Sequence, residues 1–289
     1  MTKGNICVNE IKLKSYAKIN LCLDIVNKRE DGYHNIRTIM QSLDLFDQIE
    51  IQTSNKLEIE SDHPGLPLDE RNLAYKAAKA IFEKVGIKEG AKIRITKNIP
   101  IAAGLAGGSS NAAAVLHGIN ILYGLNLTVA QLVHIGKSLG ADVPFCVVGG
   151  TVLATGIGDS LNILPPIKEY NILLVKPDVG VSTKEVYSGV DIQDLSSRPD
   201  IEKAVKSIEN HDLSGLVGSM GNVLEPVTSR MVKEVLEIKN TMLAMGADGA
   251  LMCGSGPTVF AVYSCDHKAE SMLKYFKNVY EQVYLCKTI

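Results

Sequence analysis

A lysine and an asparagine lie two positions apart in the segment Ala17-Lys18-Ile19-Asn20-Leu21. Apolar residues alternate with mostly polar ones from residue 13 to residue 25, which predicts a β-strand with one polar face. Side chains two positions apart on a strand emerge side by side from the same face. An ammonium group beside an amide can hold a substrate hydroxyl. Taken alone, Lys18 is better interpreted as a solvated strand residue.

A carboxylate follows a helix-ending glycine in the segment Gly140-Ala141-Asp142-Val143-Pro144. We therefore expect Asp142 at a helix exit with apolar neighbours. A lysine ammonium nearby would keep this carboxylate ionised and ready to accept a proton from a hydroxyl. The alternative is a helix N-cap without a catalytic role. General-base catalysis contributes about 10²–10⁴-fold, so a phosphoryl transferase also needs positioning and charge stabilisation.

A glycine-rich stretch separates a predicted strand at 92–97 from a predicted helix with an apolar stripe. Backbone N–H groups converge at the start of such a helix and favour a phosphate there. Glycines let phosphate oxygens approach the backbone, and serines can cap the helix or bind phosphate or Mg²⁺. A glycine turn without a ligand is the alternative, but the strand–loop–helix context favours phosphate. The stretch is Pro100-Ile101-Ala102-Ala103-Gly104-Leu105-Ala106-Gly107-Gly108-Ser109-Ser110-Asn111.

Motif spacing, charge and composition argue against several classes of protein. The Gly-Lys-Ser at 136–138 has Gln131 where a Walker loop needs its first glycine. A formal net charge of -2 provides no general attraction to nucleic acid or anionic lipid. The N-terminus lacks an apolar signal core, and the cysteines, Cys7 among them, form no Cys-x-x-Cys pair. We therefore expect a cytoplasmic protein with reduced thiols and without nucleic-acid or membrane partners.

The pattern of elements favours an α+β fold. Pro165 and Pro166 interrupt regular structure, so we predict two domains, 1–165 and 166–289. Thr128 and Gln131 offer a capping box for a helix that Gly140 would end. Further strands are predicted at 49–59, 171–175, 258–263 and near the C-terminus, and further helices at 72–85, 201–208, 229–245 and 269–276.

Together with the glycine-rich stretch, the Lys18 and Asp142 segments and Cys253-Gly254-Ser255-Gly256-Pro257-Thr258 resemble the motifs of the galactokinase, homoserine kinase, mevalonate kinase and phosphomevalonate kinase superfamily. Asp31-Gly32-Tyr33-His34, downstream of Lys18, is similar to the diphosphocytidyl-methylerythritol kinase branch of non-mevalonate isoprenoid synthesis. The resemblance spans nearly the whole chain. It implies a ribosomal-protein-S5-like N-terminal domain, a ferredoxin-like C-terminal domain, and ATP-dependent phosphorylation of the acceptor's 2-hydroxyl, with ADP as the second product.

The resemblance also implies roles at the acceptor. Asp142 would be the base, Lys18 its charge partner and Asn20 an amide that orients the substrate. Tyr33 would stack on cytosine and His34 would read its polar edge. The other face of the ring would be closed by Tyr187.

For ATP and Mg²⁺, the resemblance implies that the loop holds the phosphates and that Ser110 binds the metal. Asn72 and Lys97 would lie around the adenine. Ala106 replaces a glycine that some relatives have. The oligomeric state is expected to be monomer or homodimer. The implied phosphate-loop residues are Pro100, Gly104, Leu105, Gly107, Gly108, Ser109 and Ser110.

Two other functions compete with this interpretation. One is a kinase of the same superfamily acting on homoserine, mevalonate or a sugar, from which the Tyr33–His34 turn distinguishes the cytidine branch. The other is a nucleotide-binding regulator or an RNA-binding module on an S5-like fold, since fold alone does not imply function. A regulator would need neither Lys18 nor Asp142, and the near-neutral charge disfavours RNA.

Overall fold

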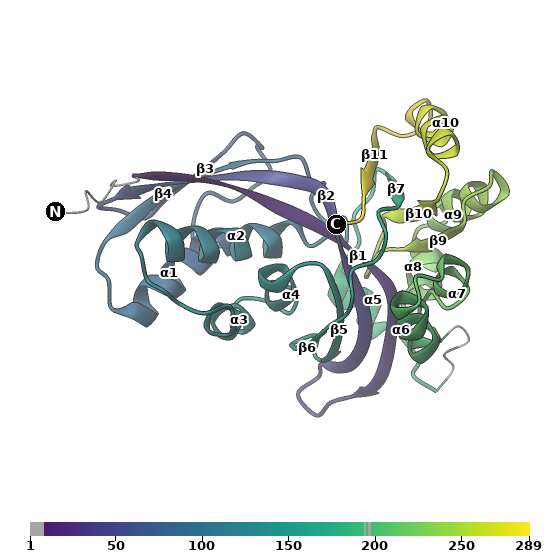
Figure 1. Cartoon of the computed structure of the whole chain (residues 1–289), viewed down its shortest axis with the longest axis horizontal. Coiled ribbons are helices and arrows are strands. Elements are labelled where there is room, and N and C mark those ends of the chain that lie inside the picture. The colour runs from purple at the N-terminus through teal and green to yellow at the C-terminus, as the bar shows by residue number, and fades with distance from the viewer. Residues whose placement is uncertain (1–8, 194, 196–197) are drawn as a thin grey trace. The chain divides into compact units, whose positions relative to one another are not determined.

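A computed structural model describes residues 9–193, 195 and 198–289 (Figure 1). Cys7 lies outside these residues. The chain forms two compact units that interleave along the sequence. The first unit comprises Met1–Tyr16, Phe46–Ile99 and Gly107–Val148, and the second comprises Ala17–Leu45, Pro100–Ala106 and Gly149–Ile289. Two long strands, β1 (Glu10–Lys28) and β2 (His34–Ser54), contribute residues to both units.

The first unit packs helices on a sheet with the strand order β3-β4-β2-β1. β2 pairs antiparallel with β4, from Gln48 opposite Thr96 to Ser54 opposite Gly90. Alternate isoleucines of β2 and β4 are buried against alanines of the helices, as the period of two requires. The other elements of this unit are β3 (Glu58–Ser61), β4 (Gly90–Thr96), α1 (Leu73–Val85), α2 (Gly107–Leu122), α3 (Val129–Lys137) and α4 (Val143–Val148).

The second unit contains a four-stranded antiparallel sheet with the order β11-β7-β10-β9. Along the chain its strands and helices alternate as β-α-β-β-α-β, which is the ferredoxin-like arrangement predicted for the C-terminal region. α9 and α10 pack against it around a core that includes Val235, Met242 and Phe276. The elements are β7 (Asn171–Lys176), β9 (Gly249–Met252), β10 (Val259–Tyr263), β11 (Gln282–Lys287), α9 (Glu234–Ala244) and α10 (Asp266–Lys277).

The remaining elements of the second unit adjoin the portions of β1 and β2 that belong to it. β1 pairs parallel with β8, and β2 pairs antiparallel with β5, which pairs with β6. These elements are β5 (Thr151–Gly156), β6 (Ser160–Ile163), β8 (Gly221–Asn222), α5 (Thr183–Ser188), α6 (Ile201–Glu209), α7 (Leu213–Val217) and α8 (Glu225–Met231).

Several sequence predictions hold and others are wrong. The capping box of Thr128 and Gln131 starts α3, as predicted, but α3 ends at Lys137 rather than near Gly140. The strand expected at 49–59 is interrupted after Ser54, and β3 begins at Glu58. The helix expected at 229–245 is two helices, α8 and α9, because the backbone is extended at Val232. The domain boundary near Pro165 stays a prediction, since the contact-based units follow a different, interleaved division.

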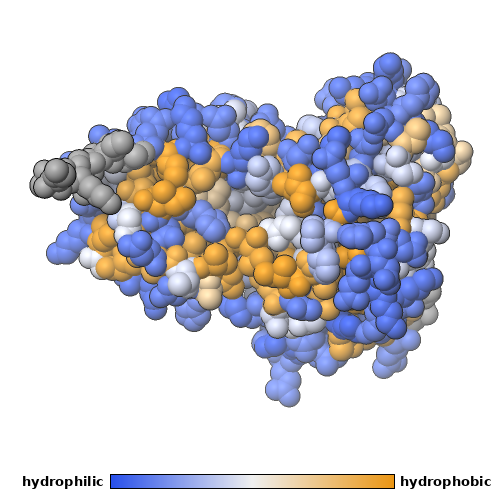
Figure 2. Space-filling model, in the orientation of Figure 1, coloured by the Kyte–Doolittle hydropathy of each residue, from blue (hydrophilic) through white to orange (hydrophobic). Residues whose placement is uncertain are grey.

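Within the described part of the chain, no helix is long and apolar enough to cross a membrane. Hydrophilic and hydrophobic residues are interspersed on the face shown in Figure 2. Large exposed apolar side chains include Ile121, Ile163 and Val279, which belong to different elements or to the loops between them.

Candidate active site

Lys18 and Asn20 lie on the same face of β1, as the alternation predicted, and they bond each other. Lys18 Nζ donates to Asn20 Oδ1 at 2.8 Å, and Asn20 Nδ2 donates to Thr38 Oγ1 at 2.8 Å. All three residues are buried. Thr38 carries no signal of this role in the sequence, because nothing in its local pattern shows that β2 places its hydroxyl beside Asn20.

The turn at 253–258 lies beside Lys18 and Asn20 in the second unit. A methyl group on Gly254 would come within 3.4 Å of Asn20 Oδ1 and 3.5 Å of Lys18 Nζ. Asn222, which sequence reasoning missed, donates from Nδ2 to the carbonyl oxygens of Met252 and Gly254, each at 2.8 Å. This buried asparagine therefore holds the turn against the Lys18–Asn20 pair.

Glu225 provides a second support for the same turn. Its Oε2 accepts the backbone N–H of Met252 at 2.8 Å, and its Oε1 forms an ion pair with Lys239. Thr228 Oγ1 donates to the carbonyl of Ser255 at 3.1 Å. Glu225 and Thr228 of α8 thus fix the backbone of Met252, just before the turn, and of Ser255, within it.

The loop at 100–106 packs onto the strand that carries Lys18. The backbone N–H of Lys18 donates to the carbonyl of Leu105 at 3.2 Å. Gly104 has φ +75, and a Cβ there would collide with the carbonyl oxygen of Cys253, so glycine is required. Ala106 also has positive φ, 57°, a backbone conformation that glycine adopts more readily. Gly104 and Leu105 are thereby brought close to Lys18 and the 253–258 turn, and Pro100 begins the same segment of the second unit.

The start of α2 belongs to the first unit. Gly108 is exposed, Gly107 and Ser109 are half-buried, and Ser110 is buried. Ser110 Oγ accepts a hydrogen bond from Ser15 Oγ at 2.8 Å, which leaves its own O–H and one lone pair for a ligand. The first backbone N–H groups of a helix suit phosphate oxygens, so phosphate binding at this turn stays a prediction.

The donor set fits a magnesium ion that phosphate oxygens mainly hold. In the described ranges, no group of three or more His, Cys, Asp or Glu side chains is placed to hold a metal. Mg²⁺ commonly keeps several waters and takes substrate phosphates and few protein ligands. The remaining lone pair of Ser110 is compatible with one such protein ligand.

Lys97 and Asp47 form a buried ion pair beneath the start of α2. The Lys97 side chain is 4% exposed and that of Asp47 is 0% exposed. A Cβ on Gly107 would lie 3.1 Å from Lys97 Nζ. The Lys97 side chain therefore supports this turn. The side chain is buried, although the residue as a whole, with its backbone included, is half-buried.

Asn72 is the N-cap of α1. Its side chain accepts the N–H of Ala74 at 2.9 Å and donates to the carbonyl of Pro67 at 2.9 Å. Because capping occupies both ends of the amide, the structural role of Asn72 is explained without a ligand.

Asp142 lies in the short connection between α3 and α4, directly before α4, whereas the sequence predicted only the helix that precedes it. Its carbonyl accepts the N–H of Cys146 at 3.0 Å at the start of α4. Glycine at 140 marks the turn between α3 and α4, because Val143 N–H donates to the Gly140 carbonyl at 3.2 Å. Asp142 is half-buried in the first unit, with access to solvent.

The turn at Tyr33 and His34 belongs to the second unit. Gly32 has φ +85, and Arg29 pairs with Asp31, whose pKa is lowered by the Arg29 hydrogen bond and by the Tyr33 N–H. Tyr33 is 64% exposed. The rings of His34 and Tyr187 lie with centroids 5.5 Å apart and planes inclined by 35°. The structure thus brings His34 and Tyr187 together.

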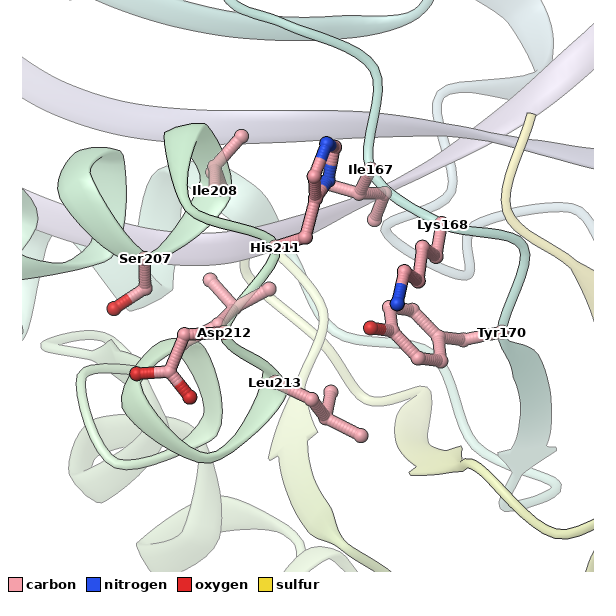
Figure 3. Close-up of a pocket in the computed structure, with 9 residues that line it drawn as sticks. Ile167, Lys168, Tyr170, Ser207, Ile208, His211, Asp212 and Leu213 are labelled. Carbon is pink, nitrogen blue, oxygen red and sulfur yellow. The ribbon is translucent and has the colours of Figure 1, made fainter.

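A small cavity elsewhere in the second unit is not a nucleotide site. Figure 3 shows Lys168 and Tyr170 facing the segment of His211 and Asp212, between α6 and α7. Its volume of about 10 Å³ is about the minimum for a single water. None of the predicted site residues lines it.

Comparisons with known proteins identify similar sequences over both halves of the chain. The family model for the GHMP kinases N terminal domain matches residues 72–150, and the model for GHMP kinases C terminal matches residues 196–282. A 4-diphosphocytidyl-2-C-methyl-D-erythritol kinase of Clostridium tetani (strain Massachusetts / E88) is 47% identical, with 96% of this chain and 100% of the relative covered. The protein of the same name from Acetivibrio thermocellus is 46% identical, with 98% and 100% covered.

Solved structures of related proteins share the fold. A crystal structure of a 4-(cytidine 5'-diphospho)-2C-methyl-D-erythritol kinase matches with a TM-score of 0.81 and 29% identity, covering 96% of this chain and 99% of the other. A homoserine kinase from Cytophaga hutchinsonii matches with a TM-score of 0.75 and 23% identity, covering 99% and 96%, and at this identity it supports the fold alone.

Proposed function

The chain belongs to the GHMP kinases and, among them, to the 4-diphosphocytidyl-2-C-methyl-D-erythritol kinase family, and on this premise we propose that it phosphorylates the 2-hydroxyl of that cytidine compound from ATP. The products are the 2-phosphate and ADP, in non-mevalonate isoprenoid synthesis. The observation that carries the proposal is the 47% identity to a named family member over 96% of this chain.

The reaction we propose is an in-line displacement. Asp142 accepts the proton of the acceptor hydroxyl, whose oxygen bonds the γ-phosphorus as the bond to the β-phosphate oxygen breaks. Lys18 provides positive charge near that hydroxyl, and Asn20 orients it. The buried hydrogen bond between Lys18 and Asn20 supports this division of roles. Most of the acceleration then comes from positioning and charge stabilisation.

For the nucleotide, we propose that the backbone from Gly104 to Ser110 cradles the phosphates, including Leu105, Gly107, Gly108 and Ser109, with Pro100 leading into the loop. The exposed first turn of α2 and the positive φ of Gly104 support this assignment. Ser110 would hold Mg²⁺, which neutralises phosphate charge when bound. Asn72 and Lys97 remain the proposed neighbours of the adenine, although the Asn72 side chain caps α1 and the Lys97 side chain pairs with Asp47.

For the acceptor, we propose that Tyr33 and Tyr187 stack on the cytosine and that His34 reads its polar edge. The exposure of Tyr33 and the proximity of the His34 and Tyr187 rings support this assignment. Stacking on an aromatic side chain contributes about 1–3 kcal/mol per base. The domain boundary near residue 165, cytoplasmic location, a monomer or homodimer, and the absence of nucleic-acid and membrane partners remain predictions.

The experiment follows ADP release from Mg²⁺-ATP with the diphosphocytidyl-methylerythritol acceptor beside homoserine, mevalonate and galactose. Turnover with the cytidine compound alone is the expected result. Turnover with another acceptor would retain the kinase class and reject the cytosine assignment. Nucleotide binding without any turnover would instead favour a regulator.

A further inference from the structure

We propose that Thr38 is a positioning residue for phosphoryl transfer, because its hydroxyl fixes the amide of Asn20 in the orientation that holds the Lys18 ammonium. The inference deepens the proposed function and rests on it. Thr38 lies on β2, 18 residues from Asn20, and is 1% exposed. It would act through Asn20 and not by touching substrate.

The chain of hydrogen bonds allows one arrangement of donors. Thr38 Oγ1 donates to the carbonyl oxygen of Cys22 at 2.6 Å. A carbonyl oxygen can only accept, so the single proton of the threonine hydroxyl is used there. Thr38 consequently presents a lone pair to Asn20, and the amide must turn its Nδ2 toward it, at 2.8 Å.

The other end of the chain imposes the same orientation. An ammonium group has three donors and no acceptor, so Lys18 Nζ requires an oxygen from Asn20. That oxygen is Oδ1, at 2.8 Å. If the Asn20 amide were flipped, its Nδ2 would face the Lys18 ammonium, donor against donor. Its Oδ1 would face Thr38 Oγ1, whose only proton is already donated to the Cys22 carbonyl.

The surroundings make this orientation consequential. Lys18 and Asn20 are each 3% exposed, so water competes little for their polar atoms. Gly254 approaches both Asn20 Oδ1 and Lys18 Nζ so closely that a methyl group there would touch them. A rotated Asn20 amide would therefore displace the ammonium in a site with little free space.

The test compares three forms of the full-length enzyme. Thr38→Val keeps the branched shape and removes the hydroxyl, and Thr38→Ser keeps the hydroxyl. Misplacement of a group by about 1 Å can cost about 10²-fold, so we expect the Val variant to lose about 10–100-fold in kcat. The KM of the Val variant for ATP should change little, and the Thr38→Ser variant should have a kcat near the wild-type value.

Thr151→Val is a matched control. Thr151 is also buried, in the second unit, and its Oγ1 donates to the side-chain amide oxygen of Gln41 at 2.6 Å. This variant should lose a comparable amount of thermal stability with no comparable loss of kcat. Equal losses of kcat in the two Val variants would show a general packing effect and overturn the proposal.

A double-mutant cycle with Asn20→Ala tests whether Thr38 acts through Asn20. If it does, Thr38→Val should cause no further loss of kcat in the Asn20→Ala background. Fully multiplicative losses, or a Val variant as active as wild type, would overturn the inference while leaving the proposed function intact. If Thr38→Val does not fold, Thr38→Ala replaces it in both measurements. A wild-type enzyme inactive on the cytidine acceptor would instead reject the proposed function itself.

Discussion

The carboxylate of Asp47 and the ammonium of Lys97 form a buried ion pair 50 residues apart in sequence. Asp47 Oδ1 also accepts the backbone N–H groups of Asn98 and Ile99, each at 2.8 Å, and Oδ2 accepts Asn111 Nδ2 at 2.8 Å. One carboxylate therefore joins the end of β4, the entry to the glycine-rich stretch and the first turns of α2.

Asp47→Asn should destabilise the protein and weaken nucleotide binding. An asparagine can still accept the two backbone N–H groups, but its Nδ2 would face the donors of Lys97 and Asn111. Removing one partner of a buried ion pair typically costs about 3–5 kcal/mol. Urea unfolding should show a loss of this size, and KM for ATP should rise more than KM for the acceptor.

The control for that experiment is Glu50→Gln in the same unit. Glu50 pairs with Lys12 at 3.0 Å, but the Lys12 side chain is 59% exposed. Solvent screening makes such pairs weak, so neither stability nor KM for ATP should change much. A Glu50→Gln effect as large as that of Asp47→Asn would contradict the special role of the buried pair.

Asn222→Ala should impair turnover by releasing the 253–258 turn. It would leave two buried carbonyls without the donors they now have, at a cost of about 1–3 kcal/mol for each unsatisfied group. We expect lower kcat with nucleotide affinity retained, measured by steady-state kinetics and calorimetric titration of nucleotide. Asn210→Ala is the comparison, because Asn210 Nδ2 bonds the Lys206 carbonyl at an exposed position. Unchanged kcat in Asn222→Ala would show that the 253–258 turn keeps its conformation without the Asn222 hydrogen bonds.

Asp142→Ala should bind ATP and fail to turn over. Loss of a general base typically costs about 10²–10⁴-fold in rate. Nucleotide affinity is measured by calorimetry and turnover by ADP release. Lys18→Met, measured separately, distinguishes the base from its charge partner. Substantial activity in Asp142→Ala would remove the assignment of the base without affecting that of Lys18.

His34 should remain neutral to lower pH than an ordinary histidine. Burial lowers its pKa, and the positive charge of Lys28 lowers it further. As pH falls below about 6.5, His34 gains a proton in the unfolded chain before it does so in the folded one. The contribution of His34 to stability is therefore fully present above that pH and declines below it. NMR titration should show the lowered pKa, and Lys28→Met should raise it only in part because burial is the larger cause. An ordinary His34 pKa in the wild type would contradict the burial argument.

Ala106→Gly should stabilise the loop slightly. A non-glycine residue in the left-handed region costs about 1–2 kcal/mol. Glycine removes this cost, but its greater conformational entropy in the unfolded chain offsets part of the gain. With φ of 57° at Ala106, we expect a gain of up to about 1 kcal/mol in the free energy of unfolding, measured in urea. Gly180→Ala, where φ is not positive and no atom lies within 4 Å of a Cβ, serves as the comparison. A loss of stability in Ala106→Gly would show that the loop carries no strain there.

Local patterns in the sequence determined the elements and the chemical types they carry. The alternation around Lys18 and Asn20 predicted the shared face of β1, and Thr128 with Gln131 predicted the start of α3. Glycine-rich sequence between a strand and an apolar-striped helix predicted the start of α2. Each of these signals depends on residues a few positions apart, where backbone geometry alone decides which side chains are neighbours.

Only the tertiary structure decided which distant groups bond one another. Thr38, Asp47 and Asn222 gave no signal in the sequence, because each meets its partner 18 to 64 residues away across separate strands and helices. The structure also decided that a short helix, α4, begins directly after Asp142, since six residues are too few for helical periodicity to be recognised in the sequence. Periodicity assigns a face to a residue, whereas packing of the folded chain selects the donor or acceptor that faces it.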